Sequence, residues 1–415
     1  MSENVNTSPE TVKLKRAIGL PLLVLYGLGI TIGAGIYVLI GAATTEAGAY
    51  APSAFLVAAF VMVFSALSFA ELSGRYPQSA GEAIYVDAGF KKDWLTLFTG
   101  LSIVAAATIA GAAISIGCAG YLGSLISLPH YVLVSAVILS MGFVAARGVK
   151  DSLIFAGILT VIEIVGLLVI VVAGFIDQPD MLTKLPTAFP SLSDGAALTG
   201  VMSASLVAFF AFIGFDDVVN MVEETKNPKR TMPLAIIISL VAVTVVYFLV
   251  VFVAVQSVPL PELGASRAPI GMLFGKLTGL SPVAITLVAI VATINRVVIE
   301  IIMTSRVIYG LGKKGRIPKS LAAVNPKTFV PTNATILITF VMLALALFVP
   351  LDALVEWTSQ LILVAFALVN AALFVIKLRG DVAPVGIFTI PISIPIVGFI
   401  TCILLLAGPV IVQIW

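Results

Sequence analysis

Apolar residues occur along the chain in long runs that are separated by short polar segments. About 11 of these runs are long enough to cross the roughly 30 Å of hydrocarbon in a bilayer, and the strict alternation of apolar and polar residues typical of barrel strands is absent. The runs cover residues 17–41, 52–73, 94–122, 129–147, 152–175, 199–221, 233–257, 281–310, 332–349, 352–377 and 392–414. The pattern therefore predicts an all-α polytopic membrane protein.

The composition supports this class and argues against others. Hydrophobic residues make up 60% of the 415 residues and charged residues only 11%, whereas a soluble domain carries about 25% charged residues. A net charge of +2 without a basic face argues against a nucleic-acid partner. Cys118 and Cys402 lie inside apolar runs, and the single histidine, His130, stands beside a proline at the start of one. These residues predict neither a disulfide framework nor a metal site, and we expect no cofactor.

Lysine and arginine positions predict the orientation in the membrane. With a cytoplasmic N-terminus, Lys184, Arg267 and Lys276 lie outside, Arg296 falls within a span, and the other 19 of the 23 basic residues lie inside. Basic residues favour the cytoplasmic side. We therefore expect a multi-pass protein of the cytoplasmic (inner) membrane. The bias also supports the number of spans, because one missed helix would invert every later loop.

The first span carries a cluster of glycines in its middle, within GITIGAGIYVLIG at residues 29–41. Each glycine costs roughly 1 kcal/mol in a helix interior. We expect the backbone to be unwound at Gly33-Ala34-Gly35. Close packing against a neighbouring helix is the alternative explanation for such glycines, and it is sufficient for Gly27 and Gly29.

The sixth span contains FFAFIGFDD, with two carboxylates inside an apolar run. A carboxylate in a span costs about 2.5–3.5 kcal/mol on insertion scales, so we expect a break at Ile213-Gly214. Asp216 and Asp217 then lie at the start of a second half-helix. Asp216 either caps this half-helix or handles protons, and the role of Asp217 stays open.

Five spans separate the starts of the two interrupted helices, so a second copy of a five-span unit would enter from the opposite face. This is the geometry of an inverted repeat. We expect a tail at residues 1-16, the first repeat at 17-175, the second at 199-377 and an eleventh helix at 378-415. Broken helices at the midplane offer amides to a carboxylate and carbonyls to an ammonium group or cation. The predicted ligand is a small zwitterion.

Five motifs in this order resemble those of the amino acid–polyamine–organocation (APC) superfamily, across spans 1 to 10. The motifs are GITIGAGIYVLIG at 29–41, AELSGRYPQSAGEAIY at 70–85, ARGVK at 146–150, FFAFIGFDD at 209–217 leading into EETKNPKRTMP at 223–233, and SRVIYGLGKKGRIP at 305–318. The cationic amino acid transporter-like and bacterial permease branches are the most similar. The family usually has twelve spans, so the missing twelfth puts the family's dimer contacts in doubt, and a homodimer stays open.

The resemblance implies a LeuT-like fold and a secondary transporter, a permease or antiporter, that moves an amino acid by alternating access. It also implies that the substrate carboxylate meets amides of helix 1 and that its ammonium group meets carbonyls of helices 1 and 6, with Phe210 as an aromatic lid. The implied substrate-binding residues are Thr31, Gly33, Ala34, Gly35, Ile36, Phe210, Ala211, Ile213, Gly214 and Glu300.

Charged residues inside spans 5 and 8 depart from the family pattern. Glu163 and Arg296 lie near mid-membrane, and Glu300 follows Arg296 by one helical turn. In the superfamily the space between spans 1, 5 and 8 holds a sodium ion or, in some proton-coupled members, a lysine. We expect Arg296 to replace that cation and to pair with Glu163, which predicts sodium-independent transport; a purely structural ion pair is the alternative. Glu300 either favours a cationic substrate or only shares Arg296.

Other functions remain open at this stage. The substrate is an amino acid, a polyamine or another organic amine, and the transporter is an exchanger, a facilitator or a proton-coupled symporter that uses Glu163. A channel or a transporter-like sensor is a different class of protein that stays open. An enzyme is disfavoured, because the sequence contains neither HExxH nor GxSxG. The expected partners are the small substrate and membrane lipid.

Overall fold

The computed structural model describes residues 16–78, 81–147, 153–313, 315, 317–326, 328 and 330–414. All but the last residue of the expected 1-16 tail therefore lies outside the described residues. The described chain is almost entirely helical, and its β-structure is limited to a single bridge between Ile18 and Thr225.

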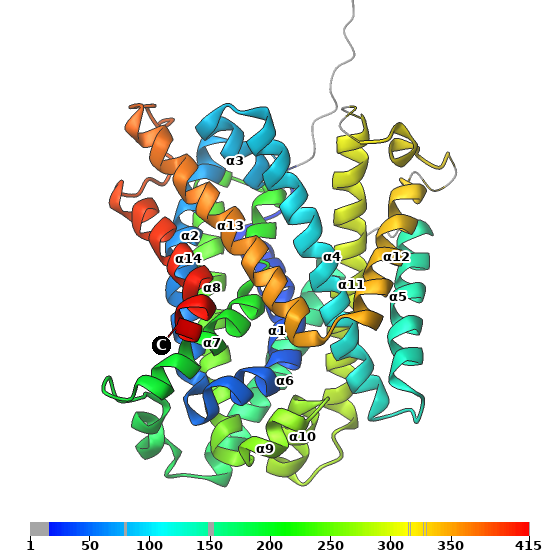
Figure 1. Cartoon of the computed structure of the whole chain (residues 1–415), viewed down its shortest axis with the longest axis vertical. Helices are drawn as coiled ribbons and strands as arrows, with labels where there is room; N and C mark the ends of the chain where they lie inside the picture. Colours follow the sequence, from blue (N-terminus) through cyan, green and yellow to red (C-terminus); the bar gives the residue numbers. More distant parts are fainter. Residues whose placement is uncertain are drawn as a thin grey trace, which may run out of the picture.

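Each predicted span corresponds to one long helix (Figure 1). The long helices are α1 (Leu20–Ala47), α2 (Ala51–Arg75), α4 (Asp93–Gly123), α5 (His130–Arg147), α6 (Leu153–Asp177), α7 (Gly195–Phe212), α8 (Pro228–Ser257), α11 (Val283–Lys313), α12 (Thr332–Phe348), α13 (Leu351–Leu378) and α14 (Ser393–Ile414). Shorter α-helices are α3 (Gly81–Phe90), α9 (Leu260–Ala265) and α10 (Pro269–Thr278), and 3-10 helices are η1 (Gly48–Tyr50), η2 (Met181–Ala188), η3 (Asp216–Met221) and η4 (Lys319–Ala322). The prediction of an all-α fold is confirmed.

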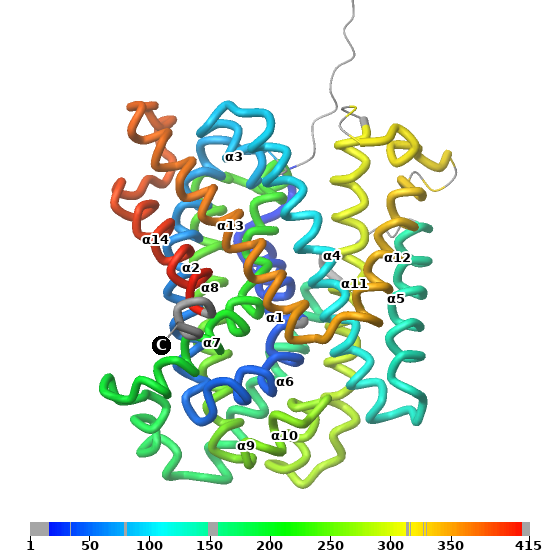
Figure 2. Tube along the Cα trace, in the orientation of Figure 1, coloured from blue at the N-terminus to red at the C-terminus, as the bar shows by residue number. Residues whose placement is uncertain are grey.

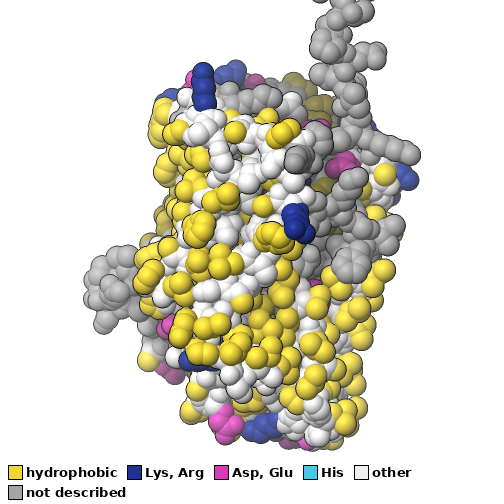
Figure 3. Space-filling model, turned by 90° about the vertical axis from the view of Figure 1, so that its right-hand side faces the viewer, with side chains coloured by type: hydrophobic (Ala, Val, Ile, Leu, Met, Phe, Trp, Pro, Cys, Tyr) yellow, Lys and Arg dark blue, Asp and Glu magenta, His cyan; other side chains and the backbone are white. Residues whose placement is uncertain are grey.

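The helices are suited to a membrane. Within the described residues, eight helical segments are long and apolar enough to cross one, with the second part of α1 and all of α2 counted together as Gly35–Arg75. Three shorter apolar helices, Leu20–Gly33, Thr332–Phe348 and Ser393–Gly408, accompany them. Hydrophobic side chains dominate the face in Figure 3; the charged ones are few, most of them lie towards its two ends, and one Lys or Arg lies nearer the middle. The protein is a multi-pass membrane protein.

Local sequence signals mark several helix starts. Pro21, Pro52 and Pro228 occupy the first or second position of α1, α2 and α8, where the missing N–H of proline has no intrahelical partner to lose. Asp194 precedes α7, and its carboxylate accepts the N–H of Ala197. Such a cap stabilises a helix by about 1 kcal/mol.

Long helices of the first half of the chain pack against the long helices that have the same position in the order of the second half. α1 packs against α7, α2 against α8, α4 against α11 and α5 against α12. The short helix α3 follows α2, and α9 and α10 follow α8; Figure 1 places α3 and the α9–α10 pair at opposite ends of the bundle. The last helix, α14, lies beside α2 and α13 (Figure 2).

Basic residues separate between these two ends. At one end, Arg267 lies between α9 and α10, and Lys276 lies in α10. At the other end, Lys91 and Lys92 directly follow α3. This separation agrees with the loop assignment from the sequence. Further basic residues of that assignment lie outside the described residues: Lys13, Lys15, Lys150, Lys314, Arg316 and Lys327.

A buried ion cluster joins α2 to α13 at the α3 end of the bundle. The carboxylate of Glu71 is fully buried and accepts hydrogen bonds from Arg75 (Nε, 2.9 Å), Lys377 (Nζ, 2.7 Å) and the backbone N–H of Ile390 (2.8 Å). Lys377 also donates to the carbonyl of Ile390 at 2.7 Å. The cluster therefore ties the segment before α14 to both helices.

We expect Glu71→Ala to lower the stability of the purified protein by about 3–5 kcal/mol, because it leaves two cations without their buried partner. Thermal unfolding in detergent measures the effect. Asp180→Ala is the matched control: Asp180 pairs with Lys184 on the surface at 3.3 Å, with 63% of its side chain exposed, and its loss costs less than about 1 kcal/mol. Equal, small shifts for both variants would contradict the structural role of the cluster.

Candidate functional site

The sixth predicted span is broken where the sequence predicts it. α7 ends at Phe212, Ile213 turns to an extended conformation, and Gly214 has φ +135°. This φ is open to glycine and strained for other residues. The N–H of Gly214 donates to the carboxylate of Asp216 at 2.9 Å. The chain then continues as the 3-10 helix η3, which begins at Asp216, and not as the α-helical half expected there.

The expected break in the first span is wrong. α1 runs as one helix from Leu20 to Ala47, so Gly33-Ala34-Gly35 lies inside regular helix, where amides bond to carbonyls four residues earlier. The glycines serve close packing instead. A methyl group at Gly35 would overlap the Cα atom of Ala211 in α7. The amides of Ala34, Gly35 and Ile36 are therefore not offered as a carboxylate site by an unwound segment.

A small cavity of about 10 Å³ lies where α1, α4, α7 and α11 meet. Its lining residues are Ile30, Thr31, Gly35, Ala110, Ile114, Phe210, Ile213, Arg296 and Glu300. We call it the central cavity. A space of this size holds about one water molecule, so an amino acid does not fit into the cavity as the structure shows it.

The central cavity brings together half of the predicted substrate-binding residues, namely Thr31, Gly35, Phe210, Ile213 and Glu300. Four other predicted residues do not line it: Gly33, Ile36, Ala211 and Gly214. The side chain of Ala34 lies outside the described set. The sequence thus predicts where the cavity lies better than it predicts which individual residues line it.

The hydroxyl group of Tyr247, in α8, lies within hydrogen-bond distance of two carbonyls that were expected to bind the ammonium group of the substrate. It lies 2.7 Å from the carbonyl oxygen of Thr31 and 3.0 Å from that of Ala211, and it bridges α1 and α7. The carbonyl of Phe210 accepts the N–H of Ile213. Tyr121 of α4 donates in the same manner to the carbonyl of Tyr37 in α1, at 2.6 Å. Sequence reasoning missed both bridging tyrosines; a lone hydroxyl within an apolar run is the signal that marks them.

Arg296 is buried and is held by two carboxylates. Its guanidinium lies 2.7 Å from Glu300, one turn along α11, and 3.3 Å from Asp217 in η3. It also donates to the carbonyl of Ile30 at 3.4 Å. The expected ion pair between Arg296 and Glu163 is therefore wrong. Glu300 lies on the same helix face, and the break after α7 carries Asp217 to the guanidinium.

A second cavity, of about 20 Å³, lies between α1, α6 and α11. Its lining residues are Tyr26, Gly29, Ile30, Thr160, Glu163, Ala292, Asn295, Arg296 and Ile299. We call it the Glu163 cavity. The Glu163 side chain is buried, and its Oε2 atom has no hydrogen-bond partner among the described residues. Glu163 and Arg296 thus share a cavity without pairing.

Glu82 of α3 is a further buried carboxyl group that sequence reasoning missed. It is only 7% exposed. Burial raises the pKa of Glu82 well above its usual range, and the negative charge of Asp216 raises it further. Glu82 therefore extends the group of acidic side chains at Asp216 and Asp217 towards the α3 end of the bundle.

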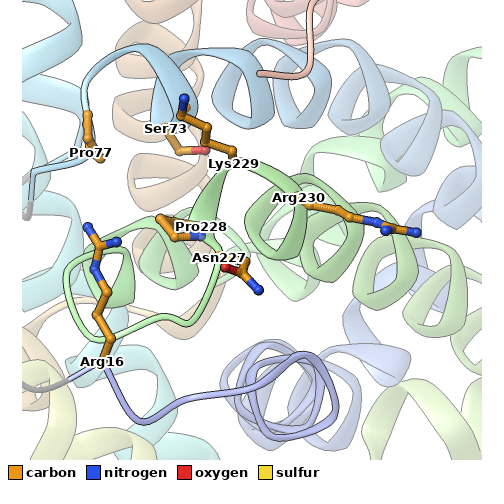
Figure 4. A pocket seen from close by; sticks show the side chains of 8 residues that line it. Arg16, Ser73, Pro77, Asn227, Pro228, Lys229 and Arg230 are labelled. Carbon is orange, nitrogen blue, oxygen red and sulfur yellow. The ribbon is translucent and has the colours of Figure 1, made fainter. Parts of the chain in front are cut away.

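A larger hollow of about 280 Å³ opens at the start of α8 (Figure 4). It is lined by Arg16, Ser73, Gly74, Pro77, Asn227, Pro228, Lys229 and Arg230. The ammonium group of Lys229 donates to the carbonyl of Val385 at 2.9 Å, and the side chain of Arg230 points away from that of Arg16. Lys229 and Arg230 lie in the first turn of α8 and Arg16 precedes α1, and none of the three lines the central cavity.

A bundle of membrane-crossing helices with one broken helix and a buried polar cavity at its centre is the architecture of a membrane transporter. Residues 18–414 match the family model described as "Amino acid permease". The chain belongs to this family, within the APC superfamily, and it is a transporter and not an enzyme.

Similar proteins come from bacteria and plants. The chain is 29% identical to the branched-chain amino acid permease BcaP of Bacillus subtilis, over 89% of this chain and 83% of that protein. It is 30% identical to the uncharacterized transporter Mb2022c of Mycobacterium bovis, over 95% of this chain and 86% of that protein. It is 31% identical to the vacuolar cationic amino acid transporter 4 of Arabidopsis thaliana, over 86% of this chain but only 62% of that protein.

We expect Gly214→Ala to destabilise the protein by about 1–3 kcal/mol, because alanine is strained at φ +135° and its Cβ atom would lie 2.7 Å from Ile30. Thermal unfolding in detergent checks the direction. Gly310→Ala in α11 is the control, since its added methyl group meets open space. A Gly214→Ala variant as stable as the Gly310→Ala variant would show that position 214 does not require glycine.

We expect Glu82→Gln to stabilise the protein increasingly as the pH rises. The folded state favours the neutral carboxyl group, since the pKa of Glu82 is raised, whereas the unfolded chain releases this proton near pH 4.3. The stability that the neutral group contributes is present below that pH and is lost as the pH rises through the folded-state pKa. Melting temperatures of both proteins at several pH values measure the difference, and a difference that shrinks with pH would contradict the burial argument.

Proposed function

We propose that this protein is a secondary active transporter that moves an amino acid across the cytoplasmic membrane by alternating access, with the substrate in the central cavity. One observation carries the proposal: α7 is broken at Gly214 beside the intact α1, and the cavity between them contains Arg296 and Glu300. Relatives named for branched-chain and for cationic amino acids support this substrate class.

The closed cavity has to open before a substrate enters. The glycine break after α7 lies next to the cavity, and residues at the ends of helices commonly act as hinges. We propose that carbonyls of the break near Phe210 and Ile213 receive the substrate's ammonium group, that Phe210 closes over the substrate, and that Glu300 faces its side chain. Ile114 and Ala110 of α4 provide apolar walls on that side.

The two halves of the chain are proposed to be inverted repeats, residues 17-175 and 199-377, in a LeuT-like arrangement. The packing of α1 on α7 and of α2 on α8 supports this symmetry, and so does the placement of α3 and of α9 with α10 at opposite ends. The basic residues favour a cytoplasmic N-terminus, and the Bacillus relative favours the inner membrane.

The proposed coupling uses no sodium. Arg296 is permanently charged and lines the Glu163 cavity between α1, α6 and α11, where its charge disfavours a sodium ion. An exchanger or a facilitator fits this arrangement. A proton-coupled symporter is the second candidate, and it is favoured by the buried Glu163, whose Oε2 atom has no hydrogen-bond partner in the part of the chain that the structure describes.

We expect uptake of radiolabelled L-alanine or L-arginine into proteoliposomes to be the same in sodium and in choline buffers, because the permanent charge of Arg296 repels a second cation from the Glu163 cavity. Counterflow against preloaded substrate tests exchange. Accumulation driven by a proton gradient that disappears in Glu163→Gln would favour the symporter instead. A strict sodium requirement would refute the role of Arg296, and binding without any transmembrane movement would identify a sensor.

A further inference from the structure

Arg296 stands in the wall between the two cavities. It lines the central cavity together with Glu300, and it lines the Glu163 cavity together with Glu163 and Thr160. Its guanidinium presently faces Glu300 at 2.7 Å and Asp217 at 3.3 Å. Arg296 therefore has carboxyl groups in both cavities, and it pairs with Glu300 and Asp217 and not with Glu163.

The buried charges around Arg296 are unequal in number. Among the buried residues that the structure describes, Arg296 is the only lysine or arginine, whereas Glu163, Asp216 and Glu300 are buried carboxyl groups in the same region. Oε2 of Glu163 lacks a hydrogen-bond partner among the described residues, since Tyr37 donates to the backbone carbonyl of Glu163 and not to its carboxyl group. A buried unpaired carboxylate is unfavourable and requires a proton or a cation beside it.

We propose that Arg296 is a movable counter-ion that leaves Glu300 for Glu163 when a basic amino acid binds. The inference rests on the proposed function of the central cavity and names basic amino acids as a substrate class for it. The ammonium group of the substrate side chain takes the place of the guanidinium at Glu300. Neutral amino acids leave the Arg296–Glu300 pair intact.

Three physical reasons support this exchange. A second cation beside Arg296 in a low-dielectric cavity meets strong repulsion unless the first one moves away. The Glu163 cavity, about 20 Å³ in volume, offers room for one additional polar group next to the Oε2 atom of Glu163, which no described residue hydrogen-bonds. The long flexible stem of Arg296 allows its five N–H donors to reorient without a shift of α11. When a basic side chain arrives, the positive charge of Arg296 therefore moves from Glu300 to Glu163, and the substrate supplies the positive charge at Glu300.

The test compares L-lysine with L-norleucine, which has a side chain of similar length without the ammonium group. Their dissociation constants are measured by calorimetry on the purified wild type, Glu163→Gln, Arg296→Met and the double variant. We expect the preference for lysine over norleucine to fall about tenfold in Glu163→Gln, as for loss of a buried charge partner. In the Arg296→Met background the preference should not depend on residue 163. Glu262→Gln, an exposed carboxylate of α9, is the control and should leave the preference as in the wild type.

Each other outcome is decisive. An unchanged preference in Glu163→Gln overturns the exchange. So does an equal loss in the wild-type and Arg296→Met backgrounds, because Glu163 then acts without Arg296. Norleucine binding without lysine binding overturns the substrate class and leaves the proposed function standing. Binding of neither, together with no uptake of other amino acids, refutes the proposed function itself.

A structure of the lysine-bound wild type provides a test that does not depend on the folding of variants. The exchange predicts that the guanidinium of Arg296 lies within about 4 Å of the Glu163 carboxyl group, the range of an ion pair, and that the lysine ammonium group lies against Glu300. A guanidinium still paired with Glu300 in that complex would overturn the proposal.

Discussion

The permanent charge of Arg296 is the constraint on which the centre of this protein depends. A guanidinium does not lose its proton in a protein, so burial within a membrane span obliges other elements to supply negative charge. Glu300 does so from the same helix, and Asp217 does so from the segment after α7. The break after α7, at Gly214, is therefore the reason that a carboxylate reaches α11.

The sequence predicts the spans well because a bilayer imposes a simple rule on length and polarity. All of the runs correspond to one long helix each, and the break at Ile213-Gly214 follows from two carboxylates that no continuous apolar helix would carry. The failure at Gly33-Ala34-Gly35 has an equally simple reason. Glycine weakens a helix and also permits another backbone to approach, and sequence alone does not separate the two; Gly35 permits the approach of Ala211.

The pairing of charges depends on tertiary placement and escapes prediction. Spacing shows that Glu163 and Arg296 both lie near mid-membrane, but which carboxylate meets the guanidinium depends on how α6, α11 and η3 are arranged in space. The structure places Arg296 against Asp217 and Glu300 and leaves Glu163 beside it in a cavity. Tyr247 was missed for a related reason, since its single hydroxyl oxygen leaves the apolar character of α8 unchanged.

The hydroxyl of Tyr247 has one hydrogen and two carbonyl neighbours, Thr31 in α1 and Ala211 in α7. At any instant its proton can point fully at only one of them. If α1 and α7 separate, α8 retains its bond to one partner and abandons the other. The carbonyl that is left behind then needs another donor, because a buried carbonyl oxygen without one costs free energy.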